Sequence, residues 1–234
     1  MNMRIRKCYM CEAEETSVEH APPRCLFPEK KDVSDGVDYR INLITVPSCD
    51  AHNSQKSQDD EYLLQALAGS YTSSQVGLTQ FITKVKRAYD RTPSKASSFI
   101  KRSDPILLKR NDSDEWEQGA EVIIEGDRLD HVLGNCARAL YFHETKVRFV
   151  GHARVFTGFT LYKHPEIHAN VTSGFEAAKA FFADRLPTGE NPDIFSYKFE
   201  KDATSAIFLM SFYATSEVLV RLDKRIHTTL GSLP

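Results

Sequence analysis

The sequence predicts an α+β fold, with a metal-stabilised module at the amino terminus and a mixed α+β domain with an antiparallel meander after it. Four of the five cysteines lie among the first fifty of the 234 residues, which indicates a local task such as metal binding. Later in the chain, apolar residues recur at helical spacing and then alternate with polar ones, as strands do. A chain of this length can bury a core in one large domain or two small ones.

We expect three segments along the chain, at residues 1–70, 71–118 and 119–234. In the first, the β-branched run at residues 41–46 predicts a strand. Residues 59–67 then predict a helix, because acidic residues stand at its start and Gly69 follows its end.

The middle segment begins with a predicted helix at residues 73–89, which Thr92 and Pro93 end. Residues 92–118 are polar, so we expect a linker there, or a long loop near a nucleic acid. The helix would bury one face, formed by Val76, Phe81, Ile82, Val85 and Tyr89.

The last segment predicts a separate α+β unit. Residues 127–145 give the clearest helix, with an apolar stripe from Leu129 to Tyr141 at spacings of three and four. We interpret His131 and His143 as surface residues of this helix rather than as a metal pair. A further helix at residues 175–186 would point Phe181 and Phe182 inward. Strands are predicted at residues 121–124 and 147–160 and, as an antiparallel meander, at residues 194–199, 206–213 and 218–222.

The composition is that of an ordinary globular protein, with 41% apolar and 26% charged residues. No apolar run approaches the roughly 20 residues that span a bilayer. The basic start leads directly into Cys8 without an apolar stretch, so we expect no secretory signal and a cytoplasmic protein. Thiols stay reduced there, so the cysteines are not expected to form disulfides.

The net charge of −2 does not indicate a nucleic-acid-binding protein by itself, but the charges are unevenly distributed. Basic residues dominate residues 84–110, where only Asp90 and Asp104 oppose them, and an acidic stretch follows. Such a segment can supply phosphate contacts, so we expect nucleic acid, preferably DNA, to bind there. The alternative is a solvated helix face and a charged linker. The basic residues are Lys84, Lys86, Arg87, Arg91, Lys95, Lys101, Arg102, Lys109 and Arg110.

Two pairs of residues with matched spacing predict a structural zinc site. Cys8 and Cys11 form a C-x-x-C knuckle, and Cys49 with His52 repeats the spacing, so together they offer four tetrahedral ligands. The alternatives are inert buried cysteines beside a surface histidine, or Cys25 in place of His52. A thioredoxin-like redox pair is disfavoured, because no βαβ pattern surrounds Cys8.

A second group of polar residues in the same segment could carry catalysis. Glu19 precedes His20, which places a possible metal ligand beside a possible general base whose ordinary pKa is near 6.5. Asn53 follows His52 and Lys56 comes soon after, although Asn53 could equally be a helix N-cap. Asn42 could be a turn residue.

The order of these elements over about residues 6–68 resembles the HNH endonuclease family. The motifs that carry the resemblance are C-x-x-C, Glu-His-x-x-Pro, Asn-Leu, and Val-Pro-x-Cys-x-x-His-Asn-x-x-Lys. The resemblance implies a zinc-stapled ββα-metal module. It also implies that His20 is the general base, Glu19 and Asn53 bind the catalytic metal, Asn42 orients the base, and Lys56 contacts phosphate.

Two positions depart from the family pattern. Residue 19 is Glu where many members have Asp, and His52 stands where many have a second Cys. His52 could therefore be the last His of the motif, but as a zinc ligand it brings Asn53 and Lys56 into register.

The resemblance implies phosphodiester hydrolysis, with Mg²⁺ or Mn²⁺ as the catalytic ion and zinc as the structural one. It further implies a defence or restriction setting. Residues 119–234 resemble no family, and they could recognise substrate, sense a signal, form a homodimer or bind a partner protein. The alternatives are an RNase on the same scaffold and a zinc-stabilised module without catalysis, which binds nucleic acid or another protein.

Overall fold

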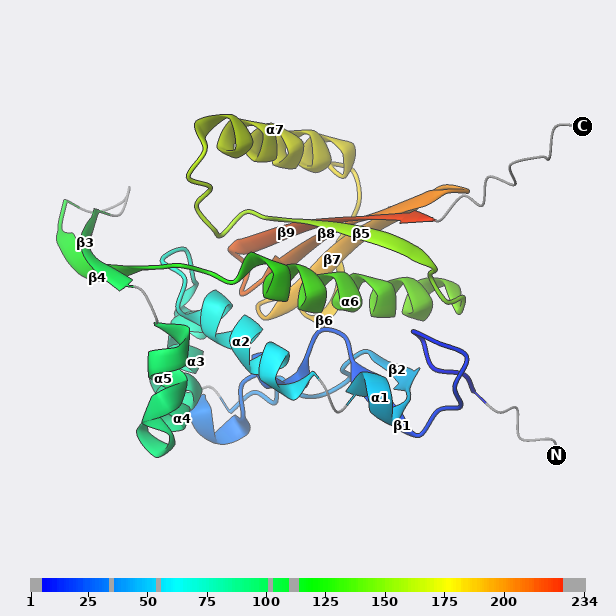
Figure 1. The fold of residues 1–234 in the computed structure, drawn as a ribbon, viewed down its shortest axis with the longest axis horizontal. Coiled ribbons are helices and arrows are strands. Elements are labelled where there is room, and N and C mark those ends of the chain that lie inside the picture. Colours follow the sequence, from blue (N-terminus) through cyan, green and yellow to red (C-terminus); the bar gives the residue numbers. More distant parts are fainter. Residues whose placement is uncertain (1–5, 34–35, 54–55, 101–102, 110–113, 225–234) are drawn as a thin grey trace, which may run out of the picture.

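The computed structural model describes residues 6–33, 36–53, 56–100, 103–109 and 114–224, and it has a mixed α+β fold. Helix α7 (Pro165–Phe181) lies on one side of an antiparallel sheet, and helix α6 (Gly126–Thr145) lies on the other (Figure 1). The amino-terminal part of the chain packs against the far side of α6. Helix α2 (Ser57–Ala68) and strand β2 (Thr45–Ser48) of that part both contact α6.

The sheet is five-stranded, with the order β5-β9-β8-β7-β6, and every neighbouring pair is antiparallel. The three strands nearest the carboxy terminus in the sequence, β7, β8 and β9, confirm the predicted meander. Strand β6 was not predicted, because its sequence Thr-Gly-Glu-Asn has no apolar residue to signal a strand. The strands are β5 (Gly151–Thr157), β6 (Thr188–Asn191), β7 (Phe195–Lys201), β8 (Ser205–Phe212) and β9 (Ser216–Lys224).

Helix α6 confirms the predicted helix at residues 127–145, and its apolar stripe packs on the inner face of the sheet. Strand β8 alternates regularly between buried and half-buried residues, as expected for a strand with one face in the core. The members of both sets are less than 6% exposed: Leu129, Val132, Leu133, Cys136, Ala137, Leu140 and Tyr141 on the helix, and Ala206, Phe208, Met210 and Phe212 on β8.

Three predictions for the carboxy-terminal region need correction. Helix α7 begins at Pro165, ten residues before the predicted start at 175, because Pro fits the first turn of a helix. Phe182 is buried, but Phe181 is 57% exposed, since consecutive helical residues point in different directions. The strand expected at 147–160 is the shorter β5.

The amino-terminal part contains a two-stranded antiparallel sheet and a short helix. Strand β1 (Ser17–His20) pairs with β2 (Thr45–Ser48), and α1 (Asp50–Asn53) follows. The strand predicted at 41–46 instead begins at Thr45 and ends at Ser48, because Asn42 adopts a left-handed turn with φ 55°. Helix α2 confirms the helix predicted at 59–67. Two 3₁₀ turns, η1 (Arg24–Leu26) and η2 (Lys30–Asp32), lie in the connection between the strands.

The helix predicted at 73–89 is a continuous run with a π-helical turn in its middle. Within the run, Val85 is buried as expected, but Ile82 is 56% exposed. A π turn inserts an extra residue and rotates the face that follows, which the regular helical spacing did not anticipate. The run consists of α3 (Gln75–Gln80), η3 (Phe81–Val85) and α4 (Lys86–Arg91).

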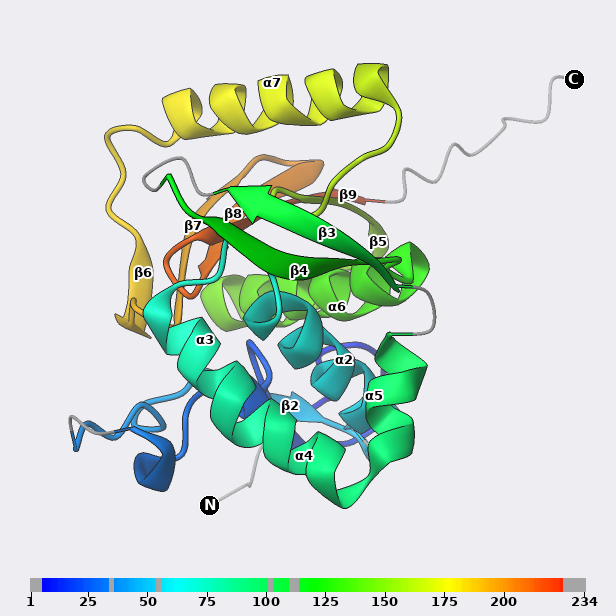
Figure 2. The ribbon, with the colours of Figure 1, turned by 90° about the vertical axis from the view of Figure 1, so that its left-hand side faces the viewer.

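Residues 92–118 are not the expected linker or long loop. Pro93 begins helix α5 (Pro93–Phe99), where its fixed φ suits the first turn. An antiparallel hairpin follows, made of β3 (Ser103–Lys109) and β4 (Trp116–Val122). Figure 2 shows it in front of the main body. Its outer face is exposed, which explains why the segment is polar enough to resemble a loop.

One hydrophobic core runs through most of the described chain, from Cys8 in the C-x-x-C motif to Leu222 in β9. Polar contacts also cross between the two ends. The Tyr213 hydroxyl donates to the Leu26 carbonyl at 2.8 Å, and the backbone N–H of Glu125 donates to the Tyr62 hydroxyl at 2.7 Å. Among the residues that the model describes, no helix is both long and apolar enough to cross a bilayer.

Candidate metal centre and its surroundings

Four side chains from three places in the chain converge on one point. Cys8 and Cys11 lie in the loop before β1, Cys49 follows β2, and His52 lies on α1. The ligand atoms of all four lie within 4.8 Å of one another. The predicted ligand set is thus assembled in space, from segments about forty residues apart.

The distances between these atoms fit a tetrahedral zinc ion. With Zn–S near 2.3 Å and Zn–N near 2.0 Å, two sulfurs should lie about 3.8 Å apart, and a sulfur and a nitrogen about 3.5 Å. Cys11 Sγ and Cys49 Sγ are 3.8 Å apart, and His52 Nδ1 lies 3.2 Å from Cys49 Sγ and 3.6 Å from Cys8 Sγ. A disulfide would need about 2.05 Å. The site can therefore hold a metal ion such as zinc.

Backbone N–H groups around the ligand cluster favour the thiolate form of Cys8. The Met10 N–H donates to Cys8 Sγ at 3.4 Å, and the N–H groups of His52 and Asn53 both donate to the Cys49 carbonyl at 3.0 Å. Burial disfavours the Cys8 thiolate, but the backbone N–H groups directed at its sulfur outweigh burial and lower its pKa. A thiolate is the form that binds zinc.

Cys25, the alternative ligand, lies elsewhere. Its thiol donates to the Asp60 carbonyl at 3.3 Å, and burial raises its pKa to about 12. A thiol held protonated in this way is a poor metal ligand. The geometry favours His52 as the fourth ligand.

Glu19 and Lys56 form a buried ion pair close to the metal centre. Lys56 Nζ lies 3.1 Å from Glu19 Oε1, and the two residues are only 6% and 4% exposed. The same ammonium donates to the Tyr9 hydroxyl at 3.3 Å. Lys56 therefore faces the interior, away from any phosphate in solution, and Glu19 already has a cation beside it.

Asp60 lies in the same buried polar cluster, one turn after Lys56. Burial raises its pKa to about 7, Lys56 opposes the rise, and the charge of Glu19 adds to it. Its Oδ1 atom is buried and has no hydrogen-bond partner among the described residues. The cluster thus places two carboxylates near a single lysine, and a proton on Asp60 relieves their repulsion.

His20 ends strand β1 and is half-buried. Burial lowers its pKa below the usual histidine value, and the nearby Arg24 lowers it further. A lowered pKa keeps the imidazole neutral at pH 7, so it can accept a proton. Thr45 is its cross-strand partner, and helix α1, which carries His52 and Asn53, packs on β1.

The two asparagines have different surroundings. Asn53 is the last residue of α1 and is not the N-cap of α2, which begins after Lys56. Asn42 lies in an exposed turn with φ 55°, a conformation that Asn tolerates better than most residues. Within the described residues it makes no hydrogen bond to His20. The turn interpretation therefore accounts for Asn42.

Many cations of the basic segment 84–110 are paired within the protein. Lys84 Nζ donates to the Cys25 carbonyl at 2.8 Å, and Arg87 makes a bidentate pair with Asp32 at 2.7 Å. The Asp32 side chain is only 3% exposed, so the Arg87 guanidinium is held within the protein and is not free for another anion. The segment therefore offers less free positive charge than its sequence suggests. The other pairs are Lys86 with Asp90, Lys95 with Glu61, and Lys109 with Asp114.

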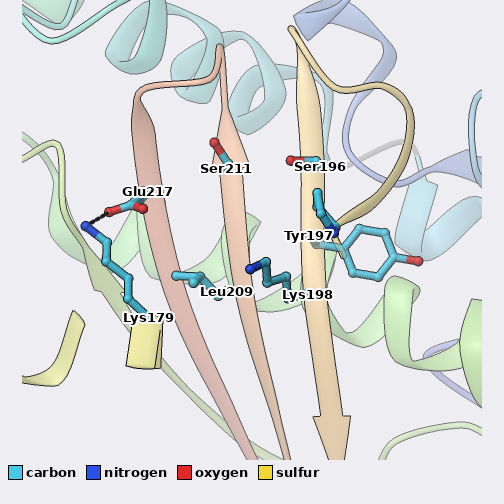
Figure 3. A pocket seen from close by; sticks show the side chains of 8 residues that line it. Lys179, Ser196, Tyr197, Lys198, Leu209, Ser211 and Glu217 are labelled. Atoms are coloured by element: carbon cyan, nitrogen blue, oxygen red, sulfur yellow. Dashed lines mark ion pairs between the residues drawn. The ribbon is translucent and has the colours of Figure 1, made fainter. Parts of the chain in front are cut away.

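A small cavity of about 230 Å³ lies on the outer face of the sheet, beneath α7 (Figure 3). Its charged groups already have partners. Lys179 pairs with Glu217 at 2.8 Å, and Lys198 Nζ donates to the Phe182 carbonyl at 2.8 Å. Tyr197 points away from the cavity and donates to Glu144 on the other face. No predicted site residue lies there.

No protein-family model matches this chain, and no curated protein and no solved structure matches it. The site is therefore interpreted from its own geometry.

Sequence reasoning missed the buried partners of Lys56. Tyr9 stands inside the C-x-x-C knuckle and looks like a spacer, while Asp60 looks like an ordinary acidic residue in the first turn of a helix. Cys136, on α6, also lies near this cluster, and burial raises its pKa to about 12. Tyr9, Lys56 and Asp60 meet only when the amino-terminal part folds, and α6 adds Cys136, so no local spacing signals the cluster.

Proposed function

We propose that this protein is an HNH-type endonuclease that hydrolyses phosphodiester bonds, with DNA as the first substrate to test. The observation that carries the proposal is the ligand cluster, which ties β1, β2 and α1 together in ββα order beside a half-buried His20. A zinc-stabilised module without enzymatic activity has no need for a histidine with a lowered pKa at the end of this strand.

In the proposed reaction His20 acts as the general base. Its neutral imidazole takes a proton from a water molecule, and the water oxygen forms a new bond to phosphorus. The bond from phosphorus to the sugar oxygen breaks, and that oxygen leaves with a proton from solvent. The zinc site positions His20 by anchoring the strand and the helix beside it.

The residues proposed for Mg²⁺ or Mn²⁺ do not fit such an ion in this arrangement. Asn53 offers an amide oxygen on α1, but the Glu19 carboxylate is already paired with Lys56, 3.1 Å away. A divalent cation there would meet the buried ammonium, which repels it. The proposed chemistry therefore rests on His20, and dependence on a divalent ion is a question for the assay.

The same ion pair favours a second candidate, a zinc-stabilised module that binds nucleic acid or another protein without cutting it. Buried and satisfied, Glu19 and Lys56 stabilise a scaffold and leave no open coordination position. A third candidate, an RNase on this scaffold, differs from the first only in substrate.

The deciding experiment measures cleavage of supercoiled plasmid, linear DNA and RNA by zinc-loaded protein. Reactions contain Mg²⁺, Mn²⁺, or no added divalent ion. His20→Ala is the test variant, and His168→Ala, which removes an exposed histidine on α7, is the matched control. We expect cutting that persists in His168→Ala and is lost in His20→Ala. If no substrate is cut by zinc-loaded, folded protein, the enzyme proposal fails and the binding module stands.

A further inference from the structure

A second cavity, of about 400 Å³, lies where the amino-terminal part of the chain meets the end of α6. One wall comes from the residues just before the zinc knuckle, the next from β2, and the third from the last turn of α6. The lining residues are Arg6, Lys7, Thr45, Val46, Pro47, Phe142, His143 and Lys146. The cavity therefore belongs to neither end of the chain alone.

The lining contains basic side chains and no acidic one, and two of its cations are not neutralised. Lys7 Nζ donates to the backbone carbonyl of Glu12 at 2.9 Å, while the Glu12 carboxylate pairs with Arg148 instead. Lys146 Nζ likewise donates only to a backbone carbonyl, that of His143, at 2.5 Å. Neither lysine has an ion pair within the described part of the chain.

Arg6 is the exception among these cations. Its guanidinium makes a bidentate ion pair with Glu15, at 2.7 and 2.8 Å. The free positive charge of the cavity therefore comes from Lys7, just before the ligand cluster, and from Lys146, at the end of α6. Two lysines so placed attract one anion between them, and ammonium groups commonly bind phosphate as point charges.

The rest of the lining is apolar, which indicates a ligand larger than a bare ion. Val46 and Pro47 form one side, and the half-buried Phe142 offers part of its ring on the other. Aromatic rings beside basic groups suit the stacked bases and phosphates of nucleic acid strands. A volume of about 400 Å³ also falls within the usual range for small-molecule sites.

We propose that this cavity binds one nucleotide unit of a nucleic acid strand, with its phosphate between Lys7 and Lys146 and its sugar or base against Phe142 and Pro47. The inference rests on the proposed function for its class of ligand, and it assigns the strand to this cavity rather than to the basic segment 84–110. Thr45 lines the cavity and is the cross-strand partner of His20. Paired Cα atoms lie about 5 Å apart, so a strand held here passes close to the proposed base.

The test uses full-length, zinc-loaded protein in the His20→Ala background, so that the substrate stays intact. Lys7→Gln with Lys146→Asn removes both charges, and Asn suits the left-handed backbone of residue 146, where φ is 57°. The control, Lys86→Gln with Lys109→Gln, removes two exposed cations of the basic segment. Binding of fluorescent single-stranded and duplex oligonucleotides is measured from low to high salt.

We expect the Lys7/Lys146 variant to bind about tenfold more weakly near physiological salt. Its slope of log affinity against log salt should be shallower by about 0.7 to 0.9, the value for one phosphate that is no longer neutralised. The control variant should change the affinity and the salt slope less than the Lys7/Lys146 variant does. The zinc content of the variant reports whether the change beside Cys8 disturbs the fold. If it does, Lys146→Asn alone tests the proposal, with an expected slope change half as large.

The proposal is overturned if the Lys7/Lys146 variant binds with the same affinity and the same salt slope as the control variant. A 5′-mononucleotide and inorganic phosphate, as direct ligands, distinguish the other source of the same chemistry. If the variant loses mononucleotide binding while its affinity for oligonucleotides is unchanged, the cavity binds free nucleotides and the strand proposal is wrong. If binding depends on these lysines but the wild-type protein cuts no substrate, the proposed nuclease activity is refuted, while the assignment of this cavity as the nucleic-acid-binding site stands.

Discussion

The described part of residues 6–53 contains only short regular elements, whereas residues 126–224 include a 20-residue helix packed on a five-stranded sheet. The first region has strands of four residues and a four-residue helix, too short to be stable by themselves. The second region buries rows of large apolar side chains. The first region has a cluster of metal ligands that can hold its short elements together, whereas the second region is held together by apolar burial.

The two regions also differ in where their ion pairs lie. The sheet keeps its ion pairs on the surface, as between Arg154 and Asp223. The amino-terminal part instead buries Glu19, Lys56 and Asp60 where it meets α6. We therefore expect that region to respond sharply to changes in metal, charge and pH, to which the sheet is indifferent.

The largest effect is expected from removing a zinc ligand. Structural zinc contributes roughly 10–16 kcal/mol of apparent binding free energy in small modules, so Cys49→Ser should unfold residues 6–53. The sheet should remain folded, because its five strands pair with one another and α6 packs on them without any of the four ligands. Hydrogen exchange resolved by peptide measures both regions at once, and we expect lost protection only in the first.

Cys25→Ser is the matched control, since it changes a buried cysteine that lies outside the ligand cluster. It should keep its zinc and the protection of both regions. Equal protection of residues 6–53 in Cys49→Ser and the wild type would mean that this region does not depend on the metal.

The next largest effect concerns the buried ion pair. Removing one partner, as in Glu19→Gln or Lys56→Met, leaves the other group buried without compensation and should cost about 3–5 kcal/mol of unfolding free energy. The double variant Glu19→Leu with Lys56→Met should lose much less, because it removes both charges. Urea unfolding of the three variants measures the difference. Additive losses in the double variant would show that the pair is not coupled as the structure indicates.

A smaller effect is expected from Asp60, through pH. Its pKa in the folded protein is about 7, above the ordinary value of 3.8, so the folded state binds more protons between these values. Stability should therefore fall as pH rises through that window, by about 2–4 kcal/mol in total. Asp60→Asn cannot titrate, so its stability should vary less with pH and exceed that of the wild type at pH 8.

Urea unfolding between pH 5.5 and 8 measures this difference while the zinc ligands stay metal-bound. Parallel curves for Asp60→Asn and the wild type would remove Asp60 as the cause of the pH dependence.

The smallest effect is expected on the hairpin. Trp116 is 64% exposed on the outer face of β4, so Trp116→Ala should change the unfolding free energy by less than about 0.5 kcal/mol. Thermal unfolding measures it. A loss of 2 kcal/mol or more would indicate that this face is covered in solution.

The sequence predicted what periodicity and ligand spacing encode. The stripe of α6 and the alternation of β7 to β9 follow from burial on one face, and the zinc ligands follow from two matched pairs. The hairpin at 103–122 was missed because neither of its faces is deeply buried, so its apolar residues do not alternate clearly. The π turn was missed because local spacing carries no signal for one inserted residue.

The candidate site was predictable in its ligands but not in its electrostatics. His20 lies at the strand end, as expected, but the pairing of Glu19 with Lys56 depends on Tyr9, Asp60 and α6 closing over them. Those contacts join residues far apart in the sequence. The cavity beside Thr45 likewise needs Lys146, more than a hundred residues away.

We expect one metal ion, bound by Cys8, Cys11, Cys49 and His52, to hold the first region together. Elemental analysis with X-ray absorption on the purified protein tests it directly. We predict about one zinc per chain, with three sulfurs at about 2.3 Å and one nitrogen at about 2.0 Å. Protein that folds without metal, or zinc bound only by nitrogen and oxygen, would contradict it.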